Sequence, residues 1–345
     1  MKRCGEDGFA LIMTLLLLAL LALVAIIVES WITTSLGRAG ALKARVTAEQ
    51  ELDGAADRAI FTMLTNGFGA AGLLPAAPST SAAPDPAVDT STSPKPKGPA
   101  IALDGRAYRL GNVVIRLQDE GGLYDLSNPD RASLIRLLQV LGIPAADGDA
   151  MAIELNQYQT EHPDPQTAPG RNAEYTAAGL PPPRQSRLTS PWEAFRILHW
   201  PNSAALWGGT PGLADLVTTG PVGGVGINTA PAAVLVALTG IDDKEAARLI
   251  AARQNAPINN LAELRKIDAS IALPAEQSPS TLPSNIIRLR LGVAGSPLVR
   301  IVSIRLTPRE MTPYRRDFSI NQTPGAADRS PASAAIPSLP LASAQ

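Results

Sequence analysis

The chain has little of what catalytic and redox chemistry requires. Its 345 residues include one cysteine and two histidines, and aromatic residues make up only 4%. Cys4 precedes a long apolar stretch, so a chain without its first eight residues would have no cysteine. This excludes disulfides, cysteine-ligated zinc and thiol catalysis. His162, in a polar loop rich in proline, and His199, at an apolar helix end, are far apart and lack zinc-site spacing.

The chain also lacks an excess of charge of one sign and a recognisable catalytic motif. Its net charge is −1, so it has no basic footprint for nucleic acid. There is no phosphate loop and no order of nucleophile, histidine and acid. Two pairs of adjacent carboxylates stand out, Asp119-Glu120 and Asp242-Asp243, but adjacent residues do not face each other on a regular element. We expect a strand-end turn and a helix N-cap, and predict that the protein is not an enzyme.

What the sequence does contain is a long apolar run near its start. Phe9 to Val28 are twenty residues without a charge, enough for a helix of roughly 30 Å that crosses a bilayer. A secretory signal has an apolar core of only about 7–15 residues, followed by a small-residue cleavage site. Glu29-Ser30-Trp31 is not such a site. We therefore predict a permanent single-pass membrane anchor; the lysines and arginines that flank it leave its orientation open.

The helical pattern continues beyond the apolar run. Apolar residues recur at helical spacing as far as Met63, and Asn66-Gly67 is a stop signal. This predicts one helix over 9–66, membrane-embedded at first and amphipathic afterwards. The residues that follow, 67–105, include the Pro/Ser/Thr/Ala-rich stretch 75–99, whose composition predicts a flexible loop.

The remainder reads as strands on either side of a helical block. Residues 106–118 predict one strand, residues 285–320 predict three more, and residues 321–345 predict a disordered tail. Within 119–284 we expect helices, with a loop at 160–189, a helix from Ser190 to about His199, and a helix-hairpin-helix at 227–264. In that last motif, Asn228 or Thr229 is expected to cap the first helix, and Asp242 or Asp243 the second. The simplest architecture is an α+β fold: a long N-terminal helix, a small antiparallel sheet, and a large inserted all-α domain.

The N-terminus resembles the type IV prepilin class. A short polar leader, residues 1–8, ends in Gly8, and Phe9 opens the apolar helix. The resemblance implies that a prepilin peptidase cuts between Gly8 and Phe9 at the cytoplasmic face and methylates the new amine of Phe9. It also implies a periplasmic C-terminal part. Most members carry a glutamate at the fifth mature position, where this chain has Met13.

The lack of that glutamate, together with two internal segments, narrows the resemblance. QDEGGLYDLSNPDRASLIRLLQVLGI and GINTAPAAVLVALTGIDDKEAARLIAAR are similar to segments of the K-type minor pseudopilin of the type II secretion system, the general secretion pathway protein K family. The first segment, from Gln118, matches the usual sequence of that family more loosely than the second does. The likeness covers about residues 8–320 and implies a type IV pilin-like fold with an inserted helical domain of the SAM or helix-hairpin-helix kind.

The resemblance implies a role in protein secretion at the bacterial inner membrane. The subunit would cap the tip of the pseudopilus and start its assembly, for export of folded proteins across the outer membrane. Implied partners are the I- and J-type minor pseudopilins, the major pseudopilin and the prepilin peptidase. A glutamate at position 13 would need a partner in apolar surroundings, normally the N-terminal amine of a neighbour. Met13 therefore marks a tip subunit.

Two alternatives stay open. One is a membrane-anchored helix-hairpin-helix protein of the DNA-uptake type, which has a sequence pattern similar to residues 227–253. The carboxylates of Asp242 and Asp243, however, would repel phosphate. Members of the pseudopilin family are also associated with calcium, which takes oxygen ligands. The acidic candidates are Asp119, Glu120, Asp125, Asp147 and Asp149, and no spacing fixes a site.

Overall fold

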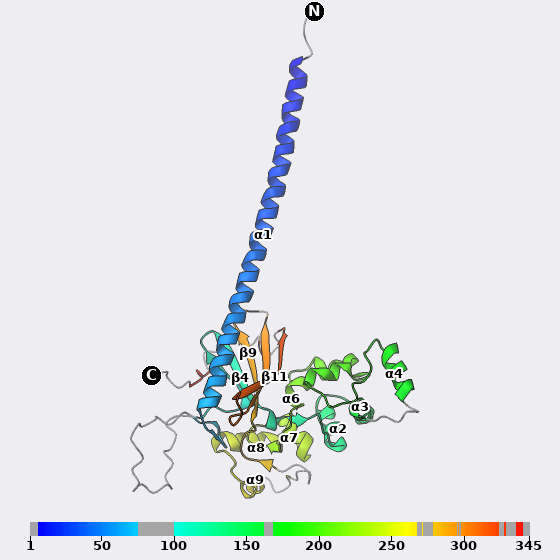
Figure 1. Ribbon diagram of the computed structural model, residues 1–345, viewed down its shortest axis with the longest axis vertical. Helices are drawn as coiled ribbons and strands as arrows, with labels where there is room; N and C mark the ends of the chain where they lie inside the picture. Colours follow the sequence, from blue (N-terminus) through cyan, green and yellow to red (C-terminus); the bar gives the residue numbers. More distant parts are fainter. Residues whose placement is uncertain are drawn as a thin grey trace, which may run out of the picture. The chain divides into compact units, whose positions relative to one another are not determined.

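The computed structural model describes residues 6–74, 100–161, 168–267, 271, 279–294, 296, 298–323, 328 and 336–340, with the side chains of residues 6–10, 168 and 169 left out. The chain divides into two units, Met1–Glu51 and Leu52–Gln345. Helix α1 (Glu6–Thr65) supplies the described part of the first unit and continues into the second (Figure 1). It ends one residue before the Asn66-Gly67 stop signal, as the sequence predicts.

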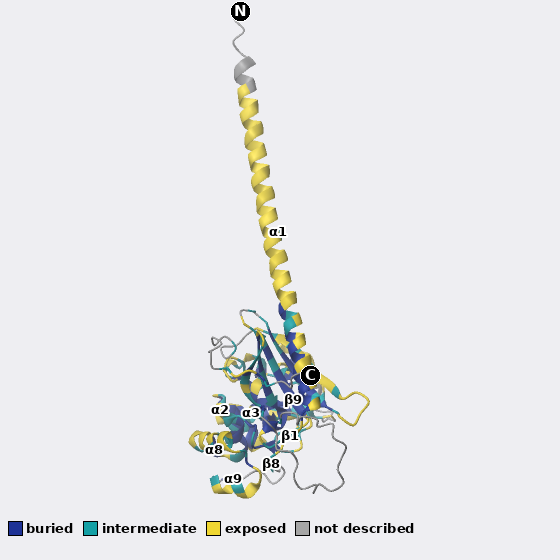
Figure 2. Cartoon of the chain, turned by 90° about the vertical axis from the view of Figure 1, so that its left-hand side faces the viewer, coloured by how far each residue is buried: buried dark blue, intermediate teal, exposed yellow. Residues whose placement is uncertain are grey.

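In the first unit α1 exposes its apolar side chains. The leucines, isoleucines and valines of residues 11–28 are all exposed (Figure 2), and an 18-residue window in this helix reaches a mean hydropathy of 3.3. In water such a surface would be strongly unfavourable. Within the described residues, α1 is the one helix long and apolar enough to cross a membrane. Its length and composition fit a single-pass anchor.

The second unit contains a five-stranded antiparallel sheet in the order β11-β10-β9-β4-β3. The strands are β3 (Asp104–Leu110), β4 (Val113–Asp119), β9 (Ile286–Val293), β10 (Val299–Leu306) and β11 (Tyr314–Gln322). Alternate residues of β4 and β9 face a core that they share with the last turns of α1. Leu52, Ile60 and Met63 from the helix are buried there against Ile115 and Leu289. The buried residues of α1 recur at helical spacing and those of the strands at every second position, and both sets pack in this one core.

The predicted single strand 106–118 is wrong, because the segment folds as a hairpin of β3 and β4. Leu110 pairs with Val113 across a two-residue turn, Gly111-Asn112, with Gly111 at φ 61°. A two-residue hairpin turn of this kind requires positive φ, which glycine adopts without strain. The Gly-Asn pair between Arg106–Leu110 and the β-branched run Val113–Ile115 was the signal for the turn.

The helical block lies between β4 and β9, which are adjacent in the sheet. It has its own core, separate from that of the sheet, with Trp200, Tyr124 and Tyr158 among its largest buried side chains. Its helices are α2 (Arg131–Val140), α3 (Ala145–Gln159), α4 (Ala168–Ala177), α5 (Ala204–Trp207), α6 (Leu213–Leu216), α7 (Ala232–Thr239), α8 (Asp243–Asn255) and α9 (Leu261–Ile267). The α+β class with a large, mainly helical insertion is thereby confirmed, although the insertion also holds two short strand pairs.

Three short pairings complete the described fold. Strands β1 (Phe68–Gly69) and β2 (Gly72–Leu73) form an antiparallel pair after α1. Two parallel pairs lie within the insertion: β5 (Tyr124–Asp125) with β6 (Val217–Thr218), and β7 (Val225–Gly226) with β8 (Pro279–Ser280). The first pair joins the start of the insertion to its middle, and the second joins its middle to its end.

Several local expectations need correction. The stretch 160–189 contains helix α4, although the loop expected at 75–99 lies outside the described residues. Where a helix was expected from Ser190 to about His199, the structure has the 3₁₀ helix η2 (Pro191–Arg196), and the side chain of Ser190 makes no capping bond. A second 3₁₀ turn, η3 (Trp200–Asn202), follows it. Pro201, three residues after Leu198, and the left-handed backbone of His199 (φ 64°) keep the segment from continuing as an α-helix.

The expectation of a disordered tail is wrong for part of residues 321–345. Asn321 and Gln322 belong to β11. Ser338 pairs with Arg109 of β3, and Leu339 is only 6% exposed, in the core shared by the sheet and α1. The low complexity of the tail concealed a single apolar side chain that docks.

Candidate functional site

The predicted processing site lies at the start of α1. Gly8 and Phe9 are helical in backbone, and their side chains lie outside the described part. Met13 follows Phe9 by four residues and is 54% exposed. The nearest described polar side chain is that of Thr14. Its hydroxyl donates a hydrogen bond to the carbonyl of Leu11 at 2.9 Å, so the hydroxyl needs no water partner. This end of the helix is therefore built for apolar surroundings.

The carboxylate of Asp119 lies where β4 leaves the sheet and the insertion begins. It is fully buried and accepts hydrogen bonds from the backbone N–H of Gly121 (2.9 Å) and Ser284 (3.0 Å). It also accepts from the hydroxyls of Thr229 (2.8 Å) and Ser284 (2.6 Å). Burial raises the pKa of Asp119, and these hydrogen bonds oppose that rise. The side chain thus joins the end of β4, the loop before β9 and the start of the helix-hairpin-helix.

Glu120, next in sequence, binds a different set of partners. It is 1% exposed, accepts from Nε of Arg288 at 3.1 Å, and accepts from the hydroxyl of Thr218 at 2.5 Å. Arg288, on β9, donates its remaining nitrogens to the carbonyls of Ala214 (2.7 Å) and Val217 (2.9 Å). The buried charges are therefore paired and hydrogen-bonded, as burial of an ion pair requires.

Asp119 and Glu120 thus form a junction that holds the insertion on the sheet. The expected strand-end turn is present as η1 (Glu120–Gly122), with Asp119 as its N-cap. Gly122 packs so closely that an added Cβ would lie 2.7 Å from the backbone nitrogen of Ala230. Thr229 serves this junction and does not cap α7, whose N-cap is Pro231. Asn228 instead bonds the backbone of Ile258 in both directions.

The helix-hairpin-helix presents its carboxylates where a phosphate would have to approach. Gly240 at φ 75° ends α7, and Asp242 caps α8 in a capping box with Glu245, as predicted. The carboxylate of Asp242 accepts from the N–H of Glu245 at 2.7 Å, and Glu245 returns a bond to the N–H of Asp242 at 2.9 Å. These amides are already bonded to carboxylates, and a negative ligand would meet repulsion there.

The candidate calcium ligands do not converge. Asp119 and Glu120 are committed to the junction, and Asp149 pairs with Arg131 at 2.6 Å. Asp125 accepts from the N–H of Ser127 at 2.8 Å, and Asp147 lies in the first turn of α3. In the part of the chain that the structure describes, no three acidic, histidine or cysteine side chains gather as a metal site.

The two histidines also play other parts than the sequence suggested. His199 is exposed, not packed, and its Nδ1 lies 2.5 Å from a carboxylate oxygen of Glu154. His162 lies outside the described residues. Sequence reasoning missed Arg288, Thr229 and Ser284 of the junction altogether. The signal was the presence of two arginines, Arg288 and Arg290, in the run IIRLRL, because an arginine that such a strand buries needs a partner to neutralise it.

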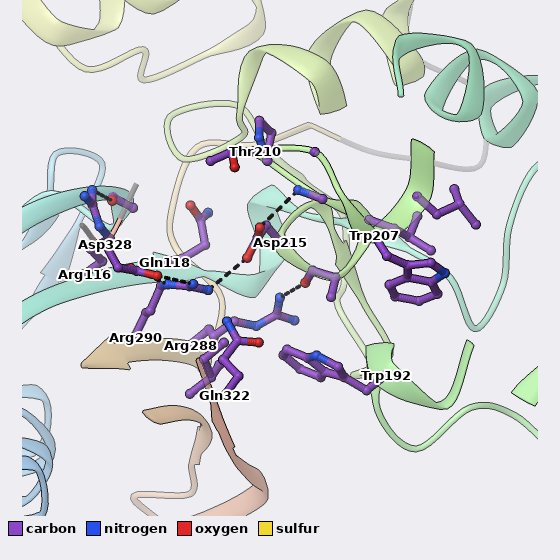
Figure 3. A pocket seen from close by; sticks show the side chains of 18 of the residues that line it. Arg116, Gln118, Trp192, Trp207, Thr210, Asp215, Arg288, Arg290, Gln322 and Asp328 are labelled. Atoms are coloured by element: carbon purple, nitrogen blue, oxygen red, sulfur yellow. Dashed lines mark hydrogen bonds and ion pairs between the residues drawn. The ribbon is translucent and has the colours of Figure 1, made fainter. Parts of the chain in front are cut away.

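A cleft of about 590 Å³ opens between the sheet and the insertion. Arg116, Gln118 and Arg290 line it from the sheet (Figure 3). From the insertion come the aromatic rings of Trp192, Phe195 and Trp207, of which the last two stack with centroids 3.6 Å apart. Nothing in the sequence indicates this cleft, because its walls come from segments far apart along the chain.

Comparison with known proteins agrees with the sequence-based resemblance. Residues 225–283, which hold the helix-hairpin-helix, match the family model described as type II secretion system (T2SS), protein K. No curated protein matches the chain significantly. Among solved structures, a chain from the GspK-GspI-GspJ complex of the enterotoxigenic Escherichia coli type 2 secretion system is similar at 18% identity and a TM-score of 0.45. The similarity covers 64% of this chain and 84% of that one. The protein K resemblance predicted from the sequence is thus confirmed by the family model, on residues 225–283.

Proposed function

We propose that this protein is a minor pseudopilin of a type II secretion system that caps the tip of the pseudopilus and initiates its assembly. The observation that carries the proposal is the N-terminal sequence: Gly8 is followed by the twenty uncharged residues Phe9 to Val28, with Met13 at the fifth position after the cut. The protein K match over residues 225–283 supports the same family independently.

The absence of a carboxylate at position 13 argues for the tip. A carboxylate in apolar surroundings must be paired, and in a pilus its partner would be the free amine of the adjacent subunit. A helix with methionine there does not require such a neighbour. The bulk of the insertion argues in the same direction, because a large helical block between two strands would be hard to repeat along a narrow shaft.

We further propose a location in the inner membrane, with α1 as the single span and the second unit in the periplasm. The partners would be I- and J-type minor pseudopilins, the major pseudopilin, and the prepilin peptidase during processing. In this role the protein performs no catalysis, and its insertion serves as a docking and packing module.

The first test is the mature N-terminus, determined by mass spectrometry from cells with and without the prepilin peptidase. We expect a peptidase-dependent start at N-methylated Phe9. Gly8→Val should leave the leader uncut, whereas Gly5→Val, a matched change within the same leader, should be processed. An intact Met1 in the presence of the peptidase would overturn the proposal.

A second test addresses the tip position. Met13→Glu should still insert into the membrane but disturb assembly order, and Met13→Gln, of similar length and without charge, should not. The measurement is co-purification with the I- and J-type subunits, together with secretion of an exported protein. If Met13→Glu left both unchanged, the argument from Met13 would fall.

A further inference from the structure

The part of α1 between the membrane span and the packed end of the helix receives no support from other described segments of the chain. The apolar span covers residues 9–28, and one face of α1 is buried against the sheet from Leu52 onward. Between them, every residue from 29 to 47 is exposed except Ser35, which is half-buried. Within the described residues, each side-chain hydrogen bond and ion pair of this stretch has its partner in α1 itself. About 28 Å of helix therefore lies outside both the bilayer and a protein core.

The sequence of this stretch is a poor helix former. SWITTSLGRAG, residues 30–40, contains two glycines, Gly37 and Gly40, and the β-branched run Ile32–Thr34. Glycine lowers helix stability more than any residue except proline, because it has the most backbone freedom to lose. β-Branched side chains lose rotamer freedom against the preceding turn. Residues 41–65, by contrast, are rich in alanine and leucine, which are strong helix formers.

Two threonine hydroxyls compete with the helix backbone at the same place. The hydroxyl of Thr33 donates to the carbonyl of Glu29 at 3.0 Å. The hydroxyl of Thr34 donates to the carbonyl of Ser30 at 2.7 Å. Each carbonyl is the one that a regular α-helix bonds to the backbone N–H of the same threonine. Such side-chain bonds slightly destabilise a helix and often bend it, and here they lie just before the two glycines.

Packing explains neither glycine. A Cβ added at Gly37 or Gly40 would meet nothing within 4 Å, and neither residue has a positive φ. An alanine would therefore fit at both positions and would strengthen the helix. Gly54 has the same open space, but it lies in the turns that pack on the sheet, between the buried Leu52 and Ala55. In the described structure, the backbone around Gly37 and Gly40 is thus held by helix propensity alone.

The helix over residues 30–41 should open more easily than the helix on either side of it. Isolated helices shorter than about 12–15 residues are marginal in water even when rich in alanine, and this stretch is poorer. Residues 11–28 differ, because in a bilayer an opened N–H or C=O would have no water to bond. We propose that residues 30–41 form a hinge in α1, where the helix opens locally and lets the second unit change its direction relative to the membrane span. The hinge requires only that α1 is a membrane anchor, and does not depend on a role at the pseudopilus tip.

Spin-label distances across the stretch test the hinge. The intact chain carries Val28→Cys and Gln50→Cys, both at exposed positions, with Cys4→Ser, and is reconstituted in lipid nanodiscs. A continuous helix would hold the two labelled positions about 33 Å apart. We expect a broad distance distribution that extends below this value, and a single narrow distribution once Gly37→Ala and Gly40→Ala are added. A single narrow distance in the chain that keeps both glycines, or equal widths with and without the two alanines, overturns the proposal.

Hydrogen exchange of the intact chain without labels provides a second measurement. Amides of residues 33–43 should exchange about twentyfold more slowly when Gly37 and Gly40 are both replaced by alanine, since each glycine lowers the helix equilibrium about four- to fivefold. Gly54→Ala is the matched control, because it adds an alanine to the packed turns of α1. It should leave both the exchange of residues 33–43 and the label distances unchanged. Equal slowing by Gly54→Ala, or no slowing in the double variant, overturns the proposal.

Discussion

Two pairs of adjacent carboxylates in this chain look alike in sequence and have opposite roles in the structure. Asp119 and Glu120 are buried at the junction between sheet and insertion, where they accept hydrogen bonds from four other segments. Asp242 and Asp243 are exposed at the start of α8, where only local amides are bonded. The same two-residue motif therefore organises the fold in one place and ends a turn in the other.

The difference lies in what surrounds each pair rather than in the pair itself. Asp119-Glu120 ends a strand of alternating burial and is followed by Gly121-Gly122, which lets other backbone segments approach closely. Asp242-Asp243 precedes a helix whose first turn gains from negative charge. Substitutions at the two pairs should separate these roles by their effect on the free energy of unfolding.

The largest effect is expected for Glu120→Ala. The change removes the carboxylate that neutralises Arg288, whose side chain is only 7% exposed, so a charge is left buried without its partner. Loss of one member of a buried pair costs about 3–5 kcal/mol. Chemical denaturation of the detergent-solubilised protein, followed by tryptophan fluorescence, measures it. Asp243→Ala is the matched control, with an expected change within about 0.5 kcal/mol.

A similar loss at both positions would contradict the distinction between the pairs. If Glu120→Ala proved nearly neutral, the charge of Arg288 would have to reach water through local opening of the junction, which hydrogen exchange at Thr218 and Arg288 would detect.

The glycines next to the two pairs provide a smaller contrast. In Gly122→Ala the new Cβ would meet the backbone of Thr229 and Ala230 at 2.7 Å, so the junction must shift, at a cost of about 1–3 kcal/mol. Gly240→Ala has open space but a left-handed backbone, and should cost about 1 kcal/mol from strain. Paired denaturation curves measure the difference. A larger loss at Gly240 would mean that the hairpin, not the junction, is the tighter turn.

The helix cap itself should contribute less. Asp242→Ala removes the acceptor for the N–H of Glu245 and should destabilise the protein by about 1 kcal/mol. Asp242→Asn, which keeps a side-chain acceptor, should lose only part of this. The same denaturation assay distinguishes them, and an equal loss in both would assign the effect to charge at the helix terminus instead of the hydrogen bond.

The smallest effect is expected from pH, at a third buried carboxylate. Burial raises the pKa of Glu193, but hydrogen bonds from Thr189 and Tyr158 and the charge of Arg184 outweigh it, so the pKa lies below its usual value. The unfolded chain then binds a proton more readily than the folded one, so this stabilisation is complete above about pH 5 and is lost as the pH falls through the folded pKa. The effect is small because Arg184 is partly exposed and screened.

Denaturation midpoints between pH 3 and pH 6 test this sign. Glu193→Gln should flatten the decline in stability at acid pH, whereas Glu161→Gln, at an exposed position, should leave it unchanged. A steeper decline in Glu193→Gln would mean that the folded state favours the protonated carboxyl.

The parts of the fold that depend on local pattern could be predicted from the sequence. The long helix ends within a residue of its stop signal, and the Asp242 cap and the three late strands follow from short-range periodicity and capping chemistry. The parts that depend on distant partners could not. Nothing near Asp119 in the sequence indicates Ser284, 165 residues away, or the role of Thr229 in the junction.

Two predictions were wrong because the average composition of a segment was used to decide whether it is ordered. The stretch 160–189 is polar and rich in proline but forms α4, because Tyr175 is buried in the insertion core. The tail was expected to be disordered, yet Leu339 and Asp328 each find a complementary site. A single apolar or charged side chain can fix a segment whose average composition predicts none, and window averages do not detect it.

The position of the insertion has a consequence for how the sheet forms. Strands β4 and β9 are antiparallel neighbours, a pairing that a two-residue turn could connect. Here the connection runs from Asp119 to Ser284. The entropic free-energy cost of closing such a loop rises by only about 0.6 kcal/mol for each doubling of its length. The insertion has its own core and meets the sheet at its two ends, so we expect the five strands to pair without it. Exchange of residues 120–285 for a short turn should therefore leave a complete five-stranded sheet on α1.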